Sequence, residues 1–151
     1  MNSAYSFILF AACGPQFRVS SADEGSMPYL DDITSNLTAL GYEGLIVMHG
    51  DGVAIVADSE RIKNVTPPLA ANGKPSRVTA FYDEDSRMIV IPSGKRNPAI
   101  ERLMLAHEIG HAMGLKHSDT GLMMREGFPE HCFGSNAALC LIEALRDGGK
   151  L

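Results

Sequence analysis

The chain has 151 residues, of which 45% are hydrophobic and 21% are charged, and its formal net charge is −5. This length and composition predict one globular domain with a buried core. The 13 Lys and Arg residues are scattered without a basic run, which argues against a nucleic-acid partner. No apolar run is long enough to span a bilayer.

The first residues pose a question of targeting. Residues 5–12 are mostly apolar and lead into Ala11-Ala12-Cys13-Gly14, which resembles the signal of a bacterial lipoprotein, where a Cys is lipidated after cleavage. We therefore expect residues 1–13 to be a signal segment, with a possible lipid anchor on Cys13. The protein would then be extracytoplasmic, either secreted or anchored at the cell envelope. Because no Lys or Arg precedes Arg18, a first strand or a tail remains the alternative.

Hydrophobic periodicity and turn residues predict the elements that follow. Strands are expected at residues 16–20, 42–48, 53–57, 78–82 and 88–91, and helices at residues 27–40, 98–114 and 137–145. The Gly50-Asp51-Gly52 segment predicts a hairpin between the second and third strands, since glycines accept positive φ. Residues 62–76, which include Pro67-Pro68 and Asn72-Gly73, predict a loop.

The helix over residues 98–114 is the most distinctive of these elements. Asn97 can cap it, and Pro98 suits its first position. The helix is apolar nearly all round, which predicts a central, buried position. From Leu103 to Leu115 its only formally charged residue is Glu108. A lone carboxylate in a buried helix needs a partner or a function.

The same helix carries the motif HExxHxxGxxH, formed by His107, Glu108, His111, Gly114 and His117. Histidines four residues apart project from one helix face, and Glu108 lies about 100° further round the axis. Gly114 can end the helix in a left-handed conformation and return His117 to the same point. Three imidazoles can hold one Zn²⁺ and leave the fourth tetrahedral position for water. Simple core packing of the histidines is the alternative, which five matching positions disfavour.

This motif, followed by Gly121-Leu122-Met123-Met124, resembles that of the metzincin clan of zinc metalloproteases. Ser118, directly after the third histidine, is similar to the matrixin type, which includes the matrix metalloproteinases. The resemblance implies that the three histidines bind one catalytic zinc ion. It also implies a Met-turn that places a methionine beneath the metal. Met123 is the expected residue, and Met124 is the alternative.

The resemblance implies an α+β, zincin-like fold over residues 14–151. A twisted mixed five-stranded sheet would pack on the buried active-site helix, followed by the Met-turn and a C-terminal helix. It implies a zinc-dependent metalloendopeptidase that hydrolyses peptide bonds through a zinc-bound water, with Glu108 as general base and acid. The substrate would be a peptide or protein extended along the edge strand at Val78–Tyr82. A monomer is expected.

Some alternatives stay open. A non-catalytic zinc-binding interaction module could use the same scaffold, although zinc binding alone does not need Glu108. Matrixins often bind Ca²⁺, and the acidic turn at Asp83–Asp85 is a candidate, but such a turn is usually only solvated. Cys132 and Cys140 would pair in an exported protein and would be free thiols in a cytosolic one. Tyr82 could stabilise an oxyanion or simply pack.

Overall fold

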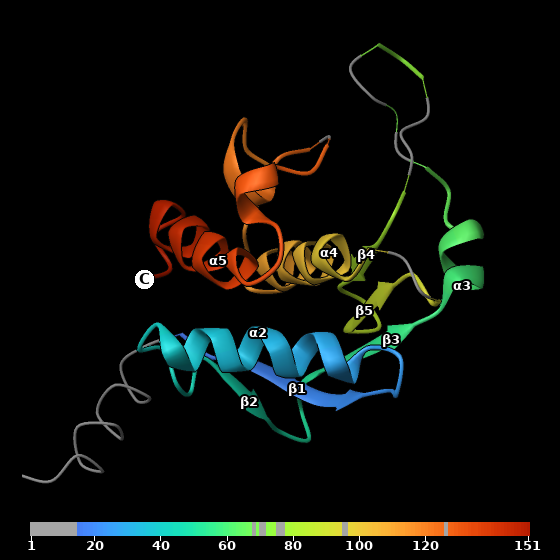
Figure 1. Cartoon of the computed structure of the whole chain (residues 1–151). Helices are drawn as coiled ribbons and strands as arrows, with labels where there is room; N and C mark the ends of the chain where they lie inside the picture. Colours follow the sequence, from blue (N-terminus) through green and yellow to red (C-terminus); the bar gives the residue numbers. More distant parts are fainter. Residues whose placement is uncertain (1–14, 68, 70–71, 75–77, 95–96, 126) are drawn as a thin grey trace, which may run out of the picture.

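The computed structural model describes residues 15–67, 69, 72–74, 78–94, 97–125 and 127–151. Within this part, the chain forms an α+β domain with a five-stranded mixed sheet and four α-helices (Figure 1), which confirms the predicted class and sheet size. The signal segment predicted for residues 1–13, with its lipid anchor on Cys13, lies outside the described residues. Among the helices that are described, none combines the length and apolarity needed to cross a membrane.

The elements agree with the predicted order, with one addition. They are β1 (Phe17–Ala22), α2 (Met27–Ala39), β2 (Ile46–Met48), β3 (Val53–Ala57), α3 (Ser59–Lys63), β4 (Phe81–Asp83), β5 (Met88–Ile91), α4 (Pro98–Ala112), the 3₁₀ turns η1 (Gly121–Met123) and η2 (Glu130–Cys132), and α5 (Asn136–Asp147). The short helix α3 begins within a region that the sequence left unassigned. Its cap is Asp58, whose side chain accepts hydrogen bonds from the N–H groups of Glu60 and Arg61.

The strands lie in the order β2-β1-β3-β5-β4. Strands β2, β1, β3 and β5 run parallel to one another, and β4 runs antiparallel to β5. The edge position predicted for residues 78–82 is therefore confirmed for β4, although the strand itself begins at Phe81 and ends at Asp83. Among the described strands β4 pairs with β5 alone, so its outer edge can accept a further extended chain.

The predicted hairpin between β2 and β3 is wrong. Val19 of β1 pairs with Met48 of β2 on one side and with Val53 of β3 on the other, so β1 lies between the two strands. The glycine-containing connection crosses β1 instead of reversing beside it. A Cβ on Gly52 would lie 2.5 Å from the carbonyl carbon and oxygen of Arg18. Glycine is required here because the chain passes directly over another main chain.

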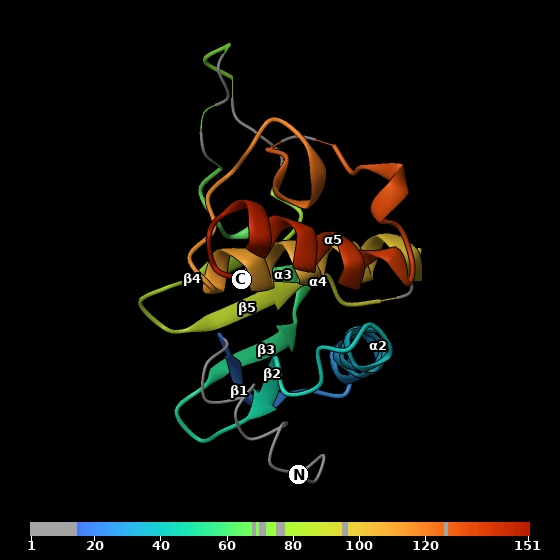
Figure 2. The ribbon, with the colours of Figure 1, turned by 90° about the vertical axis from the view of Figure 1, so that its left-hand side faces the viewer.

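One hydrophobic core joins the sheet to the helices. Phe17 and Val19 point into it while Arg18 is exposed, which is the alternation of a strand with one covered face. In Figures 1 and 2, α2 lies against the β1 and β2 end of the sheet, whereas α4 lies beside β4 and β5. The helix α5 packs on both α2 and α4. The sheet, α2 and α5 therefore enclose α4, as its apolar sequence predicts.

Candidate metal centre

The helix α4 carries the first two histidines of the motif on a fixed base. The Asn97 side chain caps it by accepting the Ala99 N–H at 3.0 Å, and Pro98 occupies the first turn, as predicted. Several of its apolar side chains, including Leu105 and Ile109, are fully buried. Burial of this length of helix fixes its rotation, and therefore the direction in which its polar side chains point.

The chain reverses directly after α4. Gly114 has φ +95°, and its N–H donates to the carbonyl of His111 at 3.0 Å. The next N–H, of Leu115, donates to the Gly110 carbonyl at 2.9 Å, and the Leu115 side chain is buried. This is a helix end of the glycine-terminated type that the sequence predicts. It returns His117 to the face of α4 that bears the other two histidines.

The three histidines meet at one point. The Nε2 atom of His111 lies 3.1 Å from Nε2 of His107 and 3.1 Å from Nε2 of His117. Two nitrogens that bind one tetrahedral zinc ion at its usual bond length lie about 3.3 Å apart. The side chains are half-buried for His107 and His111 and exposed for His117. These three residues could hold a metal ion, and they come together as the motif predicts.

Main-chain carbonyls fix the tautomers of two of these rings. Nδ1 of His107 lies 2.7 Å from the Leu122 carbonyl oxygen, and Nδ1 of His111 lies 2.8 Å from that of Leu115. A carbonyl can only accept, so each Nδ1 carries the proton and donates it. In the neutral rings both Nε2 atoms then present lone pairs to each other. Such a contact is repulsive unless a cation lies between the nitrogens.

Burial keeps these imidazoles neutral. It lowers the pKa of His107 to about 4, partly offset by the hydrogen bond to the Leu122 carbonyl. Burial also lowers the pKa values of His111 and His117, and neighbouring positive charge lowers that of His117 further. Metal ions bind the neutral form of imidazole, so the environment favours the ligand state.

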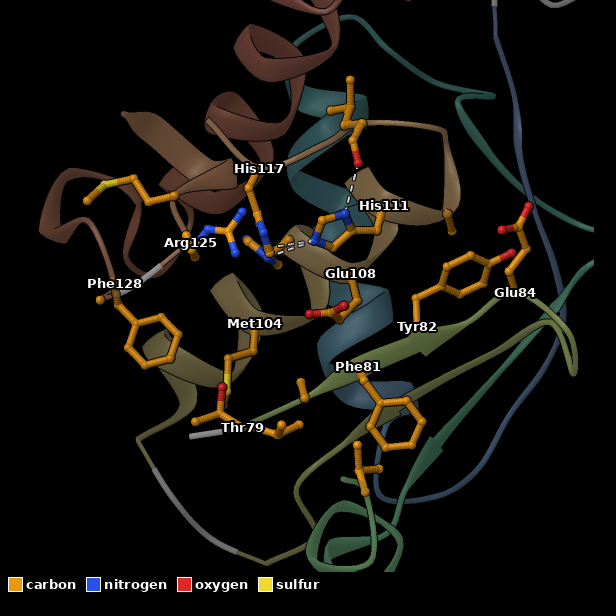
Figure 3. Close-up of a pocket in the computed structure, with 18 of the residues that line it drawn as sticks. Thr79, Phe81, Tyr82, Glu84, Met104, Glu108, His111, His117, Arg125 and Phe128 are labelled. Atoms are coloured by element: carbon orange, nitrogen blue, oxygen red, sulfur yellow. Dashed lines mark hydrogen bonds between the residues drawn. The ribbon is translucent and has the colours of Figure 1, made fainter. Parts of the chain in front are cut away.

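Glu108 lies beside the histidines and is 6% exposed. Burial raises the pKa of its carboxyl to about 8, while a hydrogen bond from the main-chain N–H of Tyr82 lowers it. In Figure 3 the carboxyl group faces the same cavity as His111 and His117. The Tyr82 hydroxyl points towards Glu84, away from the histidines. This direction argues against the role of Tyr82 in stabilising an oxyanion that the sequence left open.

The two candidate methionines have different environments. Met123 is 3% exposed, and its sulfur would lie 2.6 Å from a Cβ placed on Gly110, the residue before His111. Its thioether therefore packs on the turn of α4 that carries the histidines. Met124 is only half-buried and lines the cavity. Of the two candidates, Met123 is therefore the one that packs behind the histidines.

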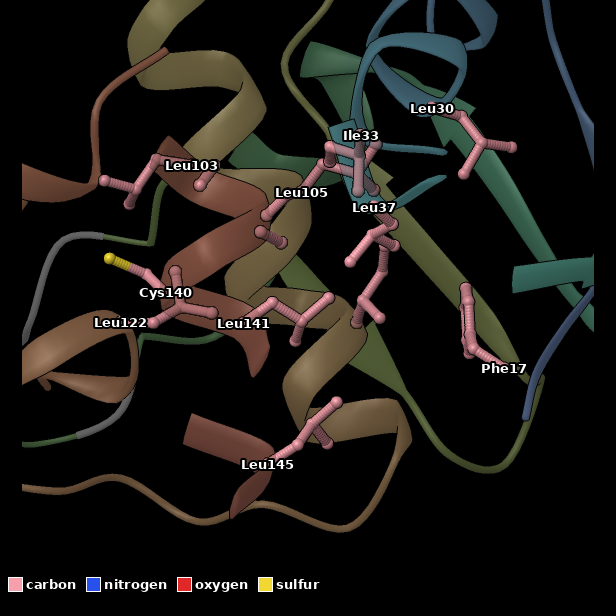
Figure 4. Packing of buried hydrophobic residues seen from close by; sticks show 14 of the residues in the cluster. Phe17, Leu30, Ile33, Leu37, Leu103, Leu105, Leu122, Cys140, Leu141 and Leu145 are labelled. Carbon is pink, nitrogen blue, oxygen red and sulfur yellow. The ribbon is translucent and has the colours of Figure 1, made fainter. Parts of the chain in front are cut away.

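The hydrophobic core supports the ligand contacts from behind. Leu122, whose carbonyl holds His107, is 2% exposed and lies beside Cys140 and Leu141 of α5 (Figure 4). Cys140 forms a disulfide with Cys132 of η2, as expected for an exported protein. The orientation of the His107 ring therefore depends on how η1 packs against α5.

The cavity in front of the histidines has a volume of about 1070 Å³. One wall is the edge strand β4 with the residues that precede it, and the opposite wall is the segment after η1. Its lining includes Phe81 from the first wall, Phe128 from the second, and Met104 of α4. A cavity of this size and lining fits several residues of an extended peptide.

Other candidate metal sites are weaker. His131, Cys132 and Cys140 also cluster, but both sulfurs are used by the disulfide. In the acidic turn, the Asp83 carboxylate accepts from the Asp85 N–H and the Ser86 hydroxyl. Across the described ranges, that turn does not bring three potential ligands together. The possible calcium site at Asp83–Asp85 therefore has no support from the structure.

Sequence reasoning missed three contributors to the site. Two are main-chain groups, the Tyr82 N–H at Glu108 and the carbonyls that hold the imidazoles, and main-chain groups leave no signal in residue identity. The third is the charge of Arg125. The resemblance implied that the segment at residues 125–128 would form the wall of the specificity pocket, but it gave the Arg125 side chain no role, and the structure places that residue in the lining of the cavity.

Comparisons of the chain with models of protein families, with curated proteins and with solved structures gave no match.

Proposed function

We propose that this protein is a zinc-dependent metalloendopeptidase of the metzincin clan, of matrixin type. The observation that carries the proposal is the convergence of three Nε2 atoms beside the buried carboxyl of Glu108, in a cavity walled by a sheet edge. A metal site that serves structure alone is normally closed by four protein ligands. Three ligands, an open side and an adjacent carboxyl group are the features of a catalytic site.

The donor set fits zinc. Imidazole nitrogens suit this ion, and the 3.1 Å separations are close to those expected in a tetrahedral complex. His107, His111 and His117 would be the ligands. The carbonyls behind His107 and His111 would hold the rings in the binding tautomer, which is the usual arrangement around a metal-bound histidine. A bound zinc ion would supply Lewis acidity, lowering the pKa of a water molecule and polarising a peptide carbonyl.

Glu108 would handle the protons of the reaction. A nearby divalent cation favours the ionised carboxylate, which opposes the effect of burial on its pKa. Glu108 would accept a proton from the attacking water and pass it to the departing amine. The Tyr82 N–H orients the carboxylate for both transfers. Because Tyr82 belongs to the edge strand, the proton carrier and the substrate wall are held by the same element.

The substrate would be a peptide or protein segment in extended form. The outer edge of β4 is open to main-chain pairing, and it lies beside the cavity. Pairing of this kind recognises any peptide main chain, and side-chain pockets then supply selectivity. We also propose an extracytoplasmic location, secreted or lipid-anchored, because disulfides such as Cys132–Cys140 persist in oxidising compartments.

The test is hydrolysis of a quenched-fluorescence peptide library by the purified protein with zinc added. Glu108→Gln should abolish cleavage while the protein still binds one zinc ion per chain, measured by elemental analysis. Glu60→Gln, on the exposed surface of α3, is the control and should cleave like the wild type. Zinc binding without cleavage by any of the three proteins would favour the alternative, a non-catalytic zinc-binding interaction module.

A further inference from the structure

Arg125 is held close to the third histidine by main-chain pairing. The Ser118 N–H donates to the Met123 carbonyl at 2.9 Å, and Ser118 forms a β-bridge with Met124. This pairing places the residue after His117 next to the residue before Arg125. In Figure 3 the guanidinium lies beside the His117 ring, between it and Phe128. The bridge between Ser118 and Met124 thus holds the main chain of Arg125 near His117, although the Arg125 side chain is exposed.

The guanidinium of Arg125 has no salt-bridge partner within the described part of the chain. An exposed arginine on a convex surface would need only hydration, but this one lines the cavity next to the candidate metal ligands. A guanidinium in such a place offers two parallel N–H donors to a carboxylate.

The cavity carries opposite charges on the two sides of the histidines. Glu84 lies beyond Tyr82 on one side, and Arg125 lies on the other (Figure 3). Strand β4 runs from Phe81 towards Glu84. A peptide with its amino-terminal part towards Glu84 and a carboxylate at Arg125 would run antiparallel to β4. The outer edge of β4 can pair with a peptide in either direction, and the charges of Glu84 and Arg125 favour this one.

From this arrangement we propose that Arg125 is a specificity-determining residue that binds a substrate carboxylate on the C-terminal side of the scissile bond. The proposal rests on the proposed function. The carboxylate could belong to an acidic side chain or to the free C-terminus of the peptide. These two sources share one chemistry, and matched peptides distinguish them. Selection by an arginine at this position would make the enzyme prefer acidic segments or chain ends.

Binding is measured first, with zinc-loaded Glu108→Gln protein and fluorescein-labelled peptides of one neutral sequence. Three peptides are compared: a C-terminal amide containing Gln, the same amide with Glu in place of Gln, and the Gln peptide with a free C-terminus. The site predicts that at least one carboxylate peptide binds about tenfold more tightly than the neutral amide. Adding Arg125→Gln should remove this preference, and adding Arg125→Lys should retain part of it. The peptide that shows the preference identifies the source of the carboxylate.

Lys74 provides the matched control because it is the other Lys or Arg residue in the described lining of the cavity. Lys74→Gln should keep the preference. Equal binding of all three peptides, or a preference that survives Arg125→Gln or is lost with Lys74→Gln, would overturn the inference. Cleavage that depends on Glu108 but shows no Arg125-dependent preference in kcat/KM would leave the peptidase standing without this site. Arg125-dependent binding without any cleavage would support the carboxylate site and count against the peptidase.

Discussion

Gly114 offers the sharpest test of how the fold holds the third histidine. Its φ of +95° is nearly the same as the +91° of Gly41, which occupies the corresponding position after α2. Alanine in such a left-handed conformation costs about 1–2 kcal/mol. A Cβ at Gly41 would meet nothing within 4 Å, and at Gly114 the nearest atom would be Nζ of Lys150 at 3.0 Å, the free end of a flexible side chain. The two substitutions therefore carry a similar main-chain cost, but only Gly114 lies between two candidate ligands.

The main-chain cost should lower the folding stability in one variant and the zinc affinity in the other. Gly41→Ala should lower the free energy of unfolding by about 1–2 kcal/mol and leave zinc binding unchanged. In Gly114→Ala, the metal-free chain can relax its reversal, which moves His117 away from His111. Zinc must then restore the strained conformation, so its dissociation constant should rise by about 5- to 30-fold, which is the same energy expressed as affinity.

Two measurements separate these outcomes. Urea unfolding with EDTA present gives the stability of each metal-free protein, and competition with a chromogenic chelator gives the zinc affinity. The reasoning fails if Gly114→Ala changes neither quantity. It also fails if Gly41→Ala weakens zinc binding as much as Gly114→Ala does.

Three further predictions address the sheet, the carboxyl group and the methionines. Gly52→Ala should lower the free energy of unfolding by about 2–3 kcal/mol, because its Cβ would meet the main chain of β1. Gly50→Ala, with no atom within 4 Å, is its control, and equal effects in urea unfolding would contradict the crossing. In metal-free protein the carboxyl pKa of Glu108 is raised from 4.5 to about 8, so the folded state binds more protons in that window and wild-type stability falls as pH rises. The free energy of unfolding of Glu108→Gln should therefore increase relative to that of the wild type as the pH rises from 5 to 8. A difference in unfolding free energy that does not change with pH would refute this. Met123→Ala should cost about 2–5 kcal/mol in the same assay, and Met124→Ala less than about 1.5 kcal/mol. The reverse ranking would place Met124 beneath the histidines.

Much of the fold is predictable where the signal is local. The limits of β3 and β5 agree with the sequence prediction, and α4 begins at Pro98 after its Asn97 cap. Strand β4 begins three residues later than expected, at Phe81, because the β-forming residues before it do not pair in the sheet. Helix α3 was missed although Asp58 carries an N-cap signal, since a five-residue helix has too little periodicity to detect.

The pairing of strands was less predictable. Glycines around Asp51 are typical of a hairpin, and the sequence contains nothing nearby that indicates a third strand between β2 and β3. The partner, β1, lies about 30 residues earlier, and its insertion is decided by which apolar faces can be buried together. The same glycine signal therefore has two structural solutions, and only the long-range contact of Gly52 with β1 distinguishes them.

In the candidate site, too, residues placed by local geometry were predictable and residues placed by long-range contacts were not. The histidines, Glu108 and Gly114 were predictable because helix geometry and a single reversal fix their relation. Arg125 was not, since its approach to His117 depends on the bridge between Ser118 and Met124. The choice of Met123 over Met124 likewise depended on burial. Positions that depend on contacts between separate segments can be assigned only from the folded structure.

The tautomers of the histidines also determine how acidity and metal would compete for the site. Main-chain carbonyls already hold the Nδ1 protons of His107 and His111, and burial keeps the pKa values of all three rings below 6.5. A site of this kind releases few protons when it takes up an ion. Because burial lowers the three pKa values, protons would compete less with a metal ion here than they do at a free imidazole. The two leucine carbonyls act in the other direction on acidity, since their hydrogen bonds raise the pKa values of His107 and His111, while they keep each Nε2 lone pair directed at the metal position.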